Sequence, residues 1–200
     1  MELNVSNSPP SEWEQWQALK PDETGFEQSQ QWARTLTELE SASPFYLVVV
    51  EGERVVASLM LVHHIPWDRE RNRPQRSLRH WLSGTSQGWI TWGAGPSVLT
   101  VDDGEIQSAL RLMIEWVDEY AAERKVLSVK GGFAHTSQVG AHANTRKLFE
   151  EFGFHHVLWA TYLVDLNQNE EELWRSLEAA ARKAVKRARR EGVKVEQIQS

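Results

Sequence analysis

Thr161–Val193 reads TYLVDLNQNEEELWRSLEAAARKAVKRARREGV, and this stretch decides how the chain is interpreted. We expect a strand over Thr161–Leu166, then a polar turn and one long amphipathic helix. Asn169 is suited to cap that helix, and the three glutamates after it place negative charge at the positive end of the helix dipole. Gly192 stands where a left-handed C-terminal cap is expected. The apolar residues recur at helical spacing and form one stripe: Leu173, Leu177, Ala181, Ala184, Val185 and Ala188.

The end of this helix is strongly basic. Arg182–Ser200 contains seven basic and two acidic residues, a net charge of +5, whereas the rest of the chain has 15 basic and 26 acidic residues, a net charge of −11. A basic helix on an acidic body indicates a local anionic partner, because the overall charge would repel one. The alternative is a solvated helix face that pairs with acidic neighbours.

The bulk composition bounds the class of protein. Two hundred residues fit one domain, or one domain and part of another, and 40% hydrophobic residues with ten tryptophans allow a packed core. The absence of cysteine excludes disulfides, thiolate metal sites and a cysteine nucleophile. The N-terminus has no basic and apolar runs typical of a secretory signal, and no segment approaches the ~20 apolar residues that span a bilayer. We therefore expect a soluble intracellular protein.

The order of elements before Thr161 predicts a mixed α/β domain. Two helices come first, around residues 11–19 and 26–41, and two apolar strands joined by Glu51-Gly52-Glu53 form a hairpin. After a strand at Trp89–Trp92, a helix begins at the cap Asp102 with Glu105 as its third-position acid. A strand over Lys125–Val129, a helix over Asn144–Glu151 and a strand from Phe154 to Trp159 complete the order.

Two other groups of residues have competing interpretations. The arginine-rich segment within residues 66–88 is interpreted as an excursion between strands that could touch nucleic-acid or lipid phosphates: Arg69, Arg71, Arg73, Arg76 and Arg79. His63 and His64 are adjacent on a predicted strand, so they face opposite sides and do not favour a shared metal. His155 and His156 repeat this arrangement. No metal and no cofactor is expected.

Several motifs together resemble the Fem-type (FemAB-like) aminoacyltransferases. The stretch that begins at Thr161 resembles the family's strand, run of acidic residues and basic helix, which ends in G-V-x-V. Phe26–Ala33 (F-E-Q-S-x-x-W-A) resembles the family's early motif near its precursor-binding cleft, and Gly93–Pro96 (G-x-G-P) resembles its turn before the long helix. Phe149–Phe154 (F-x-x-x-G-F) is also typical. The resemblance covers most of residues 26–193.

This resemblance implies a fold, a reaction and partners. The fold would be a GNAT-like (acyl-CoA N-acyltransferase-like) mixed central sheet flanked by helices over residues 1–156, and residues 157–200 would open a second, truncated GNAT-like domain. The activity would be transfer of an amino acid from aminoacyl-tRNA to a peptidoglycan precursor, either a UDP-muropeptide or lipid II. Such an enzyme would be cytoplasmic, and its peripheral contact with the inner membrane surface stays open.

The candidate binding residues are Trp32, Arg34, Arg182 and Lys186. Trp32 is expected to pack in the core or in the cleft wall, because large aromatic side chains mostly serve packing. The family usually has a lysine associated with the precursor's phosphates four residues after this tryptophan, where Leu36 stands here, and Arg34 is the nearby cation. Arg182 and Lys186 are one helical turn apart and are the candidates for phosphate contact. The catalytic residues are not predicted.

Two rival functions remain open. The first is a GNAT-like N-acyltransferase that uses an acyl-CoA donor. It would require a glycine-rich loop whose backbone N–H groups hold a pyrophosphate at the start of the long helix, and no such loop precedes Ile106. The second is a module without enzymatic activity that binds RNA or an anionic membrane through the basic helix.

Overall fold

The computed structural model describes residues 1–21, 24–40, 42–64, 88–134, 137–157 and 167–195. The chain divides into two compact units, Met1–Val157 and Leu158–Ser200. Three predictions fall wholly or partly outside the described residues: the strand at Thr161–Leu166, the end of the strand predicted at Phe154–Trp159, and the arginine-rich excursion.

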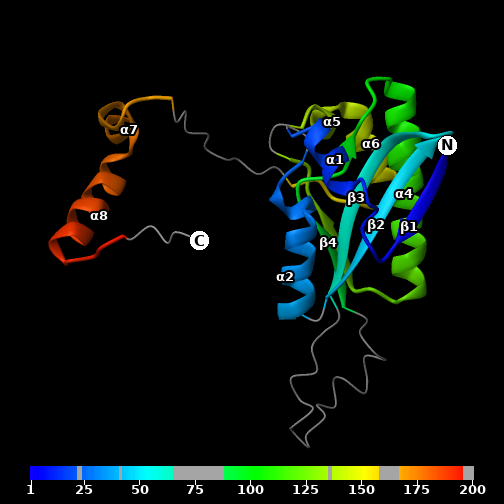
Figure 1. Ribbon diagram of the computed structural model, residues 1–200, viewed down its shortest axis with the longest axis horizontal. Coiled ribbons are helices and arrows are strands. Elements are labelled where there is room, and N and C mark those ends of the chain that lie inside the picture. Colours follow the sequence, from blue (N-terminus) through cyan, green and yellow to red (C-terminus); the bar gives the residue numbers. More distant parts are fainter. Residues whose placement is uncertain (22–23, 41, 65–87, 135–136, 158–166, 196–200) are drawn as a thin grey trace, which may run out of the picture. The chain divides into compact units, whose positions relative to one another are not determined.

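The first unit is built on one mixed sheet (Figure 1). Its strands are β1 (Glu2–Ser6), β2 (Ala42–Glu51), β3 (Arg54–His64), β4 (Trp89–Trp92) and β6 (Ser128–Gly131) in spatial order, and β5 (Ser97–Val98) pairs with β3. All pairs are antiparallel except β4 with β6, which is parallel. Gly52, with a φ of 63°, makes the tight turn of the predicted β2–β3 hairpin.

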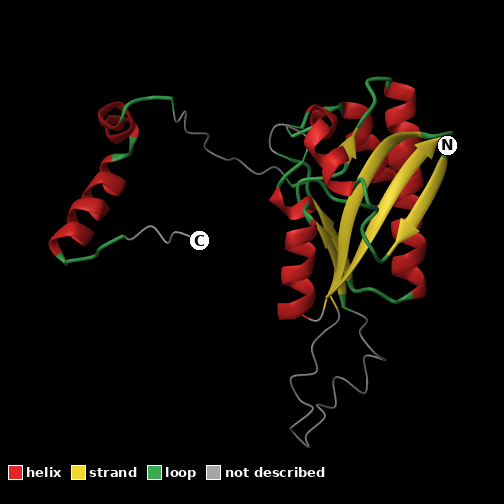
Figure 2. Ribbon diagram, viewed as in Figure 1, coloured by secondary structure: helices red, strands yellow, loops and turns green. Residues whose placement is uncertain are grey.

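Helices cover both faces of this sheet (Figure 2). One face packs against α1 (Trp13–Leu19) and α2 (Gln30–Glu40), and its core contains Trp13, Tyr46 and Met60. The other face packs against α4 (Asp103–Glu123) and α6 (Ala143–Glu151), around residues such as Leu47 and Met113. Two short helices, η1 (Phe26–Gln28) and α5 (Gln138–Ala141), lie in the connections. The prediction of a mixed central sheet flanked by helices is confirmed.

Strand β1 was not predicted from the sequence. Its residues Glu2–Ser6 pair antiparallel with Val50–Tyr46 at the edge of the sheet. Only Leu3 in this strand is half-buried, and the other four residues are exposed. Leu3 and Val5 alternate with polar residues, but the alternation is only five residues long and buries little, so backbone pairing with β2 accounts for this strand more than side-chain burial.

The strand predicted at Lys125–Val129 begins three residues later than expected. Lys125 has a φ of 51° and closes the C-terminus of α4, where its N–H donates to the carbonyl of Ala122 and the N–H of Val126 donates to that of Ala121. These two bonds are a Schellman closure, so Lys125 and Val126 belong to the end of the helix. The predicted strand from Phe154 is also wrong in its described part, because residues 154–157 are not in a strand.

The described residues of the second unit, 167–195, contain two helices where one was predicted. They are α7 (Glu170–Ser176) and α8 (Ala179–Arg190), and Leu177 and Glu178 between them have extended backbone. The hydroxyl of Ser176 donates to the carbonyl of Leu173, which competes with continued helix. The predicted ends are confirmed: Asn169 and Glu172 form a capping box, and Gly192 has a φ of 79°.

Candidate functional site

Two motifs far apart in the sequence form one packed junction in the first unit. Phe26–Gln28 lies against Gly93–Pro96, and we call this contact the FEQ–GAGP junction. The side-chain Nε2 of Gln28 donates to the carbonyl of Gly93 at 2.6 Å. Trp13, which is fully buried, donates from its indole Nε1 to the carbonyl of Gln28 at 2.8 Å and so anchors the turn from below.

Gln28 replaces a missing strand partner. Strand β3 pairs with β4 at residues 62–64 and with β5 at residues 57 and 58, and the Gly93–Pro96 turn leaves a gap between them. The Oε1 of Gln28 accepts from the N–H of Met60 at 2.7 Å, and its Nε2 donates to the carbonyl of Met60 at 3.1 Å. Since Gln28 is fully buried, these bonds satisfy backbone groups that water does not reach.

Glycine is required on both sides of the junction. A Cβ added to Gly25 would lie 2.5 Å from the Cβ of Ala94, and one added to Gly93 would lie 2.9 Å from the Cβ of Glu27. Ala94 between the glycines has a φ of 45°, in the left-handed region that alanine rarely adopts. Strained residues of this kind cluster at functional sites.

The junction lies where two parallel strands end. β4 and β6 are in register from Trp89 with Ser128 to Trp92 with Gly131. The backbone pairing continues past both strands, since the N–H of Gly132 donates to Trp92 and the N–H of Gly95 donates to Gly132. Ligands of open α/β sheets bind outside the carboxyl ends of the strands. The position of the junction is therefore suited to a binding site.

Aromatic and acidic side chains are exposed at this junction. The ring of Phe26 is 58% exposed and lies 5.4 Å, between centroids, from the half-buried ring of Trp32. Glu27 is exposed beside them. Trp32 also packs against the core cluster under α2, which was one of the two places expected for it from the sequence.

Arg34 is not brought to Trp32. It is exposed on α2, two residues or about 200° around the helix from Trp32. Leu36, at the position of the family's lysine, is 7% exposed and belongs to the core under α2. Arg34 therefore does not place its positive charge beside the exposed aromatic rings, and Leu36 carries none.

The N-terminus of α4 is acidic. The Asp102 side chain accepts from the N–H of Glu105 at 2.9 Å, and Asp103 and Glu105 also lie in the first turn. The guanidinium of Arg54, at 2.7 Å, and the Thr100 hydroxyl hold the pKa of Glu105 below its usual value. A helix N-terminus binds a pyrophosphate through its free N–H groups, and here Asp102 occupies one of them while Asp103 and Glu105 add negative charge that disfavours a second anion.

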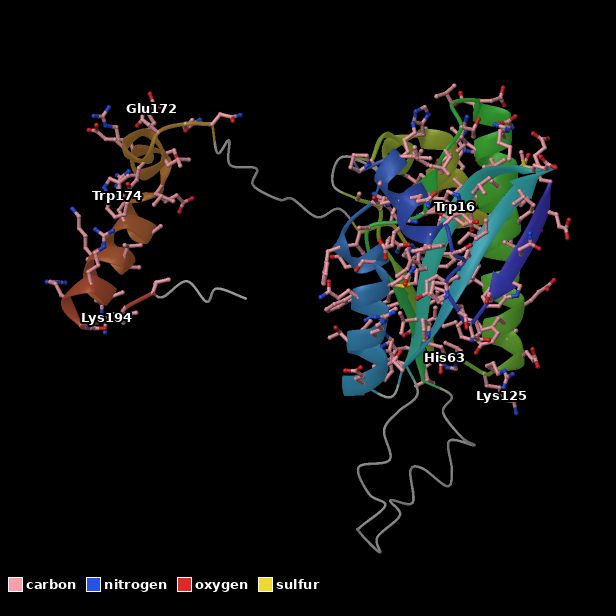
Figure 3. All side chains as sticks on the ribbon, in the orientation of Figure 1. Trp16, His63, Lys125, Glu172, Trp174 and Lys194 are labelled. Atoms are coloured by element: carbon pink, nitrogen blue, oxygen red, sulfur yellow. The ribbon has the colours of Figure 1, made fainter. Side chains whose placement is uncertain are left out.

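The two predicted cations of the second unit lie on α8 and differ in their contacts. Arg182 Nη1 donates to the carbonyls of Arg175 at 2.8 Å and Leu177 at 2.6 Å, at the end of α7. Lys186 is exposed. The guanidinium of Arg189 lies 6.0 Å from the centroid of Trp174, which Figure 3 labels where α7 meets α8.

The histidines on β3 serve packing. The Nδ1 of His63 lies 3.0 Å from the Tyr120 hydroxyl, and the Nε2 of His64 lies 2.7 Å from the Thr91 hydroxyl. The His64 ring is stacked on Trp89, with centroids 5.2 Å apart. Within the described ranges, no group of three or more metal-ligating side chains could hold an ion.

A groove of about 530 Å³ lies away from the FEQ–GAGP junction, over β1, β2 and the start of α1. Its walls include Trp16, Val48 and Val50, and its charged residues are Glu12 and Glu53. None of the predicted site residues lines it. Because both charged groups are acids, the groove does not fit the phosphates of a peptidoglycan precursor.

Comparisons with known proteins give little beyond the architecture. No protein-family profile matches the sequence, and no curated protein matches it either. Among solved structures, a ribosomal-protein-alanine N-acetyltransferase from Brucella melitensis biovar Abortus 2308 is 13% identical with a TM-score of 0.44, covering 82% of this chain and 100% of its own. A probable acetyltransferase is 10% identical with a TM-score of 0.46, covering 84% and 100%.

An aminoglycoside 6′-N-acetyltransferase from Acinetobacter haemolyticus is 16% identical with a TM-score of 0.45, covering 81% of this chain and 97% of its own. Likeness at these identities concerns the fold alone. In addition, no helix in the described part of the chain is long and apolar enough to cross a membrane.

Sequence reasoning located both halves of the junction but missed the residue that joins them. A single buried glutamine produces no periodic pattern, so the sequence F-E-Q-S does not indicate that the Gln28 side chain is buried. The same holds for Gln17, whose Nε2 donates to the buried Ser58 hydroxyl at 3.0 Å. Both side chains became recognisable only when the backbone groups and hydroxyls opposite them were known.

Proposed function

We propose that this protein is an aminoacyltransferase that moves an amino acid from aminoacyl-tRNA to the amine of a peptidoglycan precursor. The observation that carries the proposal is the contact between Phe26–Gln28 and Gly93–Pro96. Both stretches resemble Fem-type motifs, they are distant in sequence, and they meet beside the carboxyl ends of β4 and β6.

The reaction requires positioning more than reactive side chains. The acceptor amine attacks the ester carbonyl of the aminoacyl-tRNA, an amide bond forms, and the ester C–O bond breaks. The ribose oxygen leaves and takes up a proton to become a hydroxyl, and the amine loses a proton. Such a step gains most from holding both reactants and from stabilising the developing oxyanion.

The proposal assigns the two reactants to different parts of the chain. The FEQ–GAGP junction, with Phe26 and Trp32 exposed beside it, holds the precursor. The cations of α8 contact phosphates, and Lys186 is the candidate whose side chain is exposed for this purpose. Arg34 remains a candidate for contact with the precursor, on a different side of α2 from Trp32.

The acidic start of α4 separates this proposal from acyl-CoA chemistry. Asp102, Asp103 and Glu105 surround the N–H groups that a CoA diphosphate would need. We therefore expect acetyl-CoA to leave the thermal unfolding midpoint of the protein unchanged.

The test is transfer of radiolabelled amino acids from a mixture of charged tRNAs to a UDP-muropeptide or lipid II by the full-length protein. We expect label in the precursor, and less of it for Gln28→Ala than for the exposed control Gln31→Ala. Absence of transfer with every charged tRNA and both precursors would refute the proposal. Thermal stabilisation by acetyl-CoA would favour the acyl-CoA alternative instead.

A further inference from the structure

The cations of α8 fall into two groups with different contacts. Arg182 and Arg189 are held within the unit: the first donates to two carbonyls at the end of α7, and the second lies over the ring of Trp174. Both side chains join α7 to α8. An arginine that donates two hydrogen bonds to carbonyls has less freedom to bind a phosphate in the same geometry.

A second group of cations is exposed and uncommitted. Lys183, Lys186 and Arg190 have no hydrogen bond or ion pair to any residue in the described ranges. At about 100° per residue these three positions fall within an arc of roughly 60°, and they extend over about 10 Å of helix. Arg187 lies on the same side and bonds to Glu191 at 2.7 Å. We call Lys183, Lys186 and Arg190 the free cationic face.

The opposite side of α8 decides between two anionic partners. Its apolar residues are small, namely Ala181, Ala184, Val185 and Ala188. A helix that lies on a membrane buries large apolar side chains below its basic residues, and this stripe offers only one valine among alanines. The larger Leu173 and Trp174 of α7 are half-buried within the unit. The exposed Leu177 precedes α8, and the exposed Val193 and Val195 follow it, so they lie outside the helix that carries the cations. A row of cations with little apolar area beneath it fits the backbone of a nucleic acid better than a lipid surface.

Three consecutive acids lie at the other end of the second unit, and two further acids, Glu178 and Glu191, flank α8. Glu170, Glu171 and Glu172 form the first turn of α7, and Glu171 pairs with Arg175. A polyanion is therefore attracted to α8 and repelled from the start of α7. This asymmetry gives the contact a direction along the unit.

We infer that the free cationic face binds the phosphate backbone of RNA, and that Arg182 and Arg189 are positioning residues that set α8 against α7. The inference rests on the proposed function in taking the RNA to be the carrier of the amino acid. Of the two phosphate contacts expected from the sequence, Arg182 and Lys186, it keeps Lys186 and replaces Arg182 with Lys183 and Arg190.

The experiment measures binding of a fluorescein-labelled RNA hairpin with a seven-base-pair stem to the full-length protein between 50 and 300 mM salt. The triple variant Lys183→Gln, Lys186→Gln, Arg190→Gln should weaken binding at least about tenfold at physiological salt. Its slope of log Kd against log salt should fall by about two to three, since each lost phosphate contact removes about 0.7 to 0.9. The control Lys147→Gln, an exposed lysine on α6, should change neither quantity.

Arg182→Gln separates positioning from contact. A phosphate contact would lower the salt slope by about one, whereas a positioning residue leaves the slope unchanged. We expect an unchanged slope, affinity weakened about two- to fivefold, and loss of nuclear Overhauser contacts between the Trp174 ring and Arg189. An unchanged slope with intact Overhauser contacts and intact affinity would refute the positioning role.

The outcomes for the face itself are distinct from those for the proposed function. Unchanged RNA binding by the triple variant overturns the inference even if amino acid transfer occurs. RNA binding that depends on the three cations supports it even if no transfer is found. Binding of the protein to vesicles of three parts phosphatidylcholine and one part phosphatidylglycerol, with no binding to the hairpin, would show a membrane contact and overturn it.

Discussion

Helices α4 and α8 show how similar sequence patterns reach different environments. Both are amphipathic and both end in a Schellman closure, at Lys125 and Gly192 respectively. α4 buries five residues against the sheet, whereas no residue of α8 is buried within the second unit. Periodicity therefore identifies the apolar side of a helix, but burial depends on a partner that another part of the chain must supply.

Truncation of the α4 face should have the largest effect. Met113 is 1% exposed, and Met113→Ala should lower the free energy of unfolding by about 2–5 kcal/mol through lost burial and a residual cavity. Val185→Ala on α8 should change it by less than about 0.5 kcal/mol, since surface substitutions cost little. Urea denaturation of both variants measures the comparison. A similar loss for Val185→Ala would mean that the apolar stripe of α8 is packed after all.

Removal of the Gln28 side chain tests the polar part of the first unit. Gln28→Ala leaves the N–H and carbonyl of Met60 without their partner, and we expect a loss of about 2–3 kcal/mol. Gln31→Ala, an exposed position on α2, should cost well under 1 kcal/mol. Equal stabilities of the two variants by urea denaturation would contradict the assigned role.

A methyl group at Gly131 tests the close packing where β6 ends. Its Cβ would lie 1.8 Å from Cε2 of Trp92, which is 6% exposed, so the indole must move. We expect Gly131→Ala to destabilise by about 1–3 kcal/mol. The neighbouring Gly132→Ala is the matched control, because nothing lies within 4 Å of its added Cβ. Equal thermal unfolding midpoints for Gly131→Ala and Gly132→Ala would contradict this prediction.

The cap of α7 tests the second unit by itself. Asn169 accepts from the N–H of Glu172 at 3.0 Å, and Asn169→Ala should destabilise α7 by about 1 kcal/mol. Because no residue of α7 is buried, this loss should appear as reduced local helicity in NMR chemical shifts. The urea midpoint of the first unit should stay unchanged. A shift in that midpoint would show that the two units are energetically coupled.

The smallest expected effect concerns the pH dependence of the α4 cap. Hydrogen bonds from Arg54, the larger cause, and from Thr100 lower the pKa of Glu105 from its ordinary 4.5. A carboxyl group with a lowered folded pKa stabilises the protein above its unfolded pKa and loses this contribution as the pH falls through the folded value. We expect Glu105→Gln to be slightly less stable than the parent at pH 7, because exposed ion pairs contribute little.

This difference should disappear in acid, below pH 4.5. Urea midpoints of the parent and Glu105→Gln between pH 7 and pH 3 measure it. Asp118→Asn, an exposed acid on the same helix, serves as the matched substitution. A gap between the parent and Glu105→Gln that stays constant down to pH 3 would contradict the role of the Arg54 contact.

Much of the fold followed from the sequence because its signals are local. The cap Asp102 and the hairpin glycine Gly52 each predicted an element boundary that the structure has. Strand β1 and the break at Leu177 were missed, since one depends on pairing with a distant strand and the other on side chains that compete for carbonyls.

The candidate site was predicted in parts only. The motifs at Phe26 and Gly93 could be recognised separately, but their contact is a tertiary property carried by Gln28. Trp32 packs against the core under α2, as one of its two predicted places required, and its role in binding stays a prediction. Arg182 was assigned to phosphate from its charge, and its hydrogen bonds to Arg175 and Leu177 could not be read from spacing.

Because the side-chain amide of Gln28 takes the place of a strand partner, the backbone amide proton of Met60 reports on the state of the junction. The amide proton of Met60 is held by Gln28 alone on that side, so its exchange with deuterated solvent requires only that the short η1 turn lifts away. Its neighbours on β3 exchange through separation of paired strands. A ligand that holds the η1 turn in place would slow hydrogen exchange at Met60 selectively. Exchange of this one proton would therefore detect ligand binding at the junction before any product is formed.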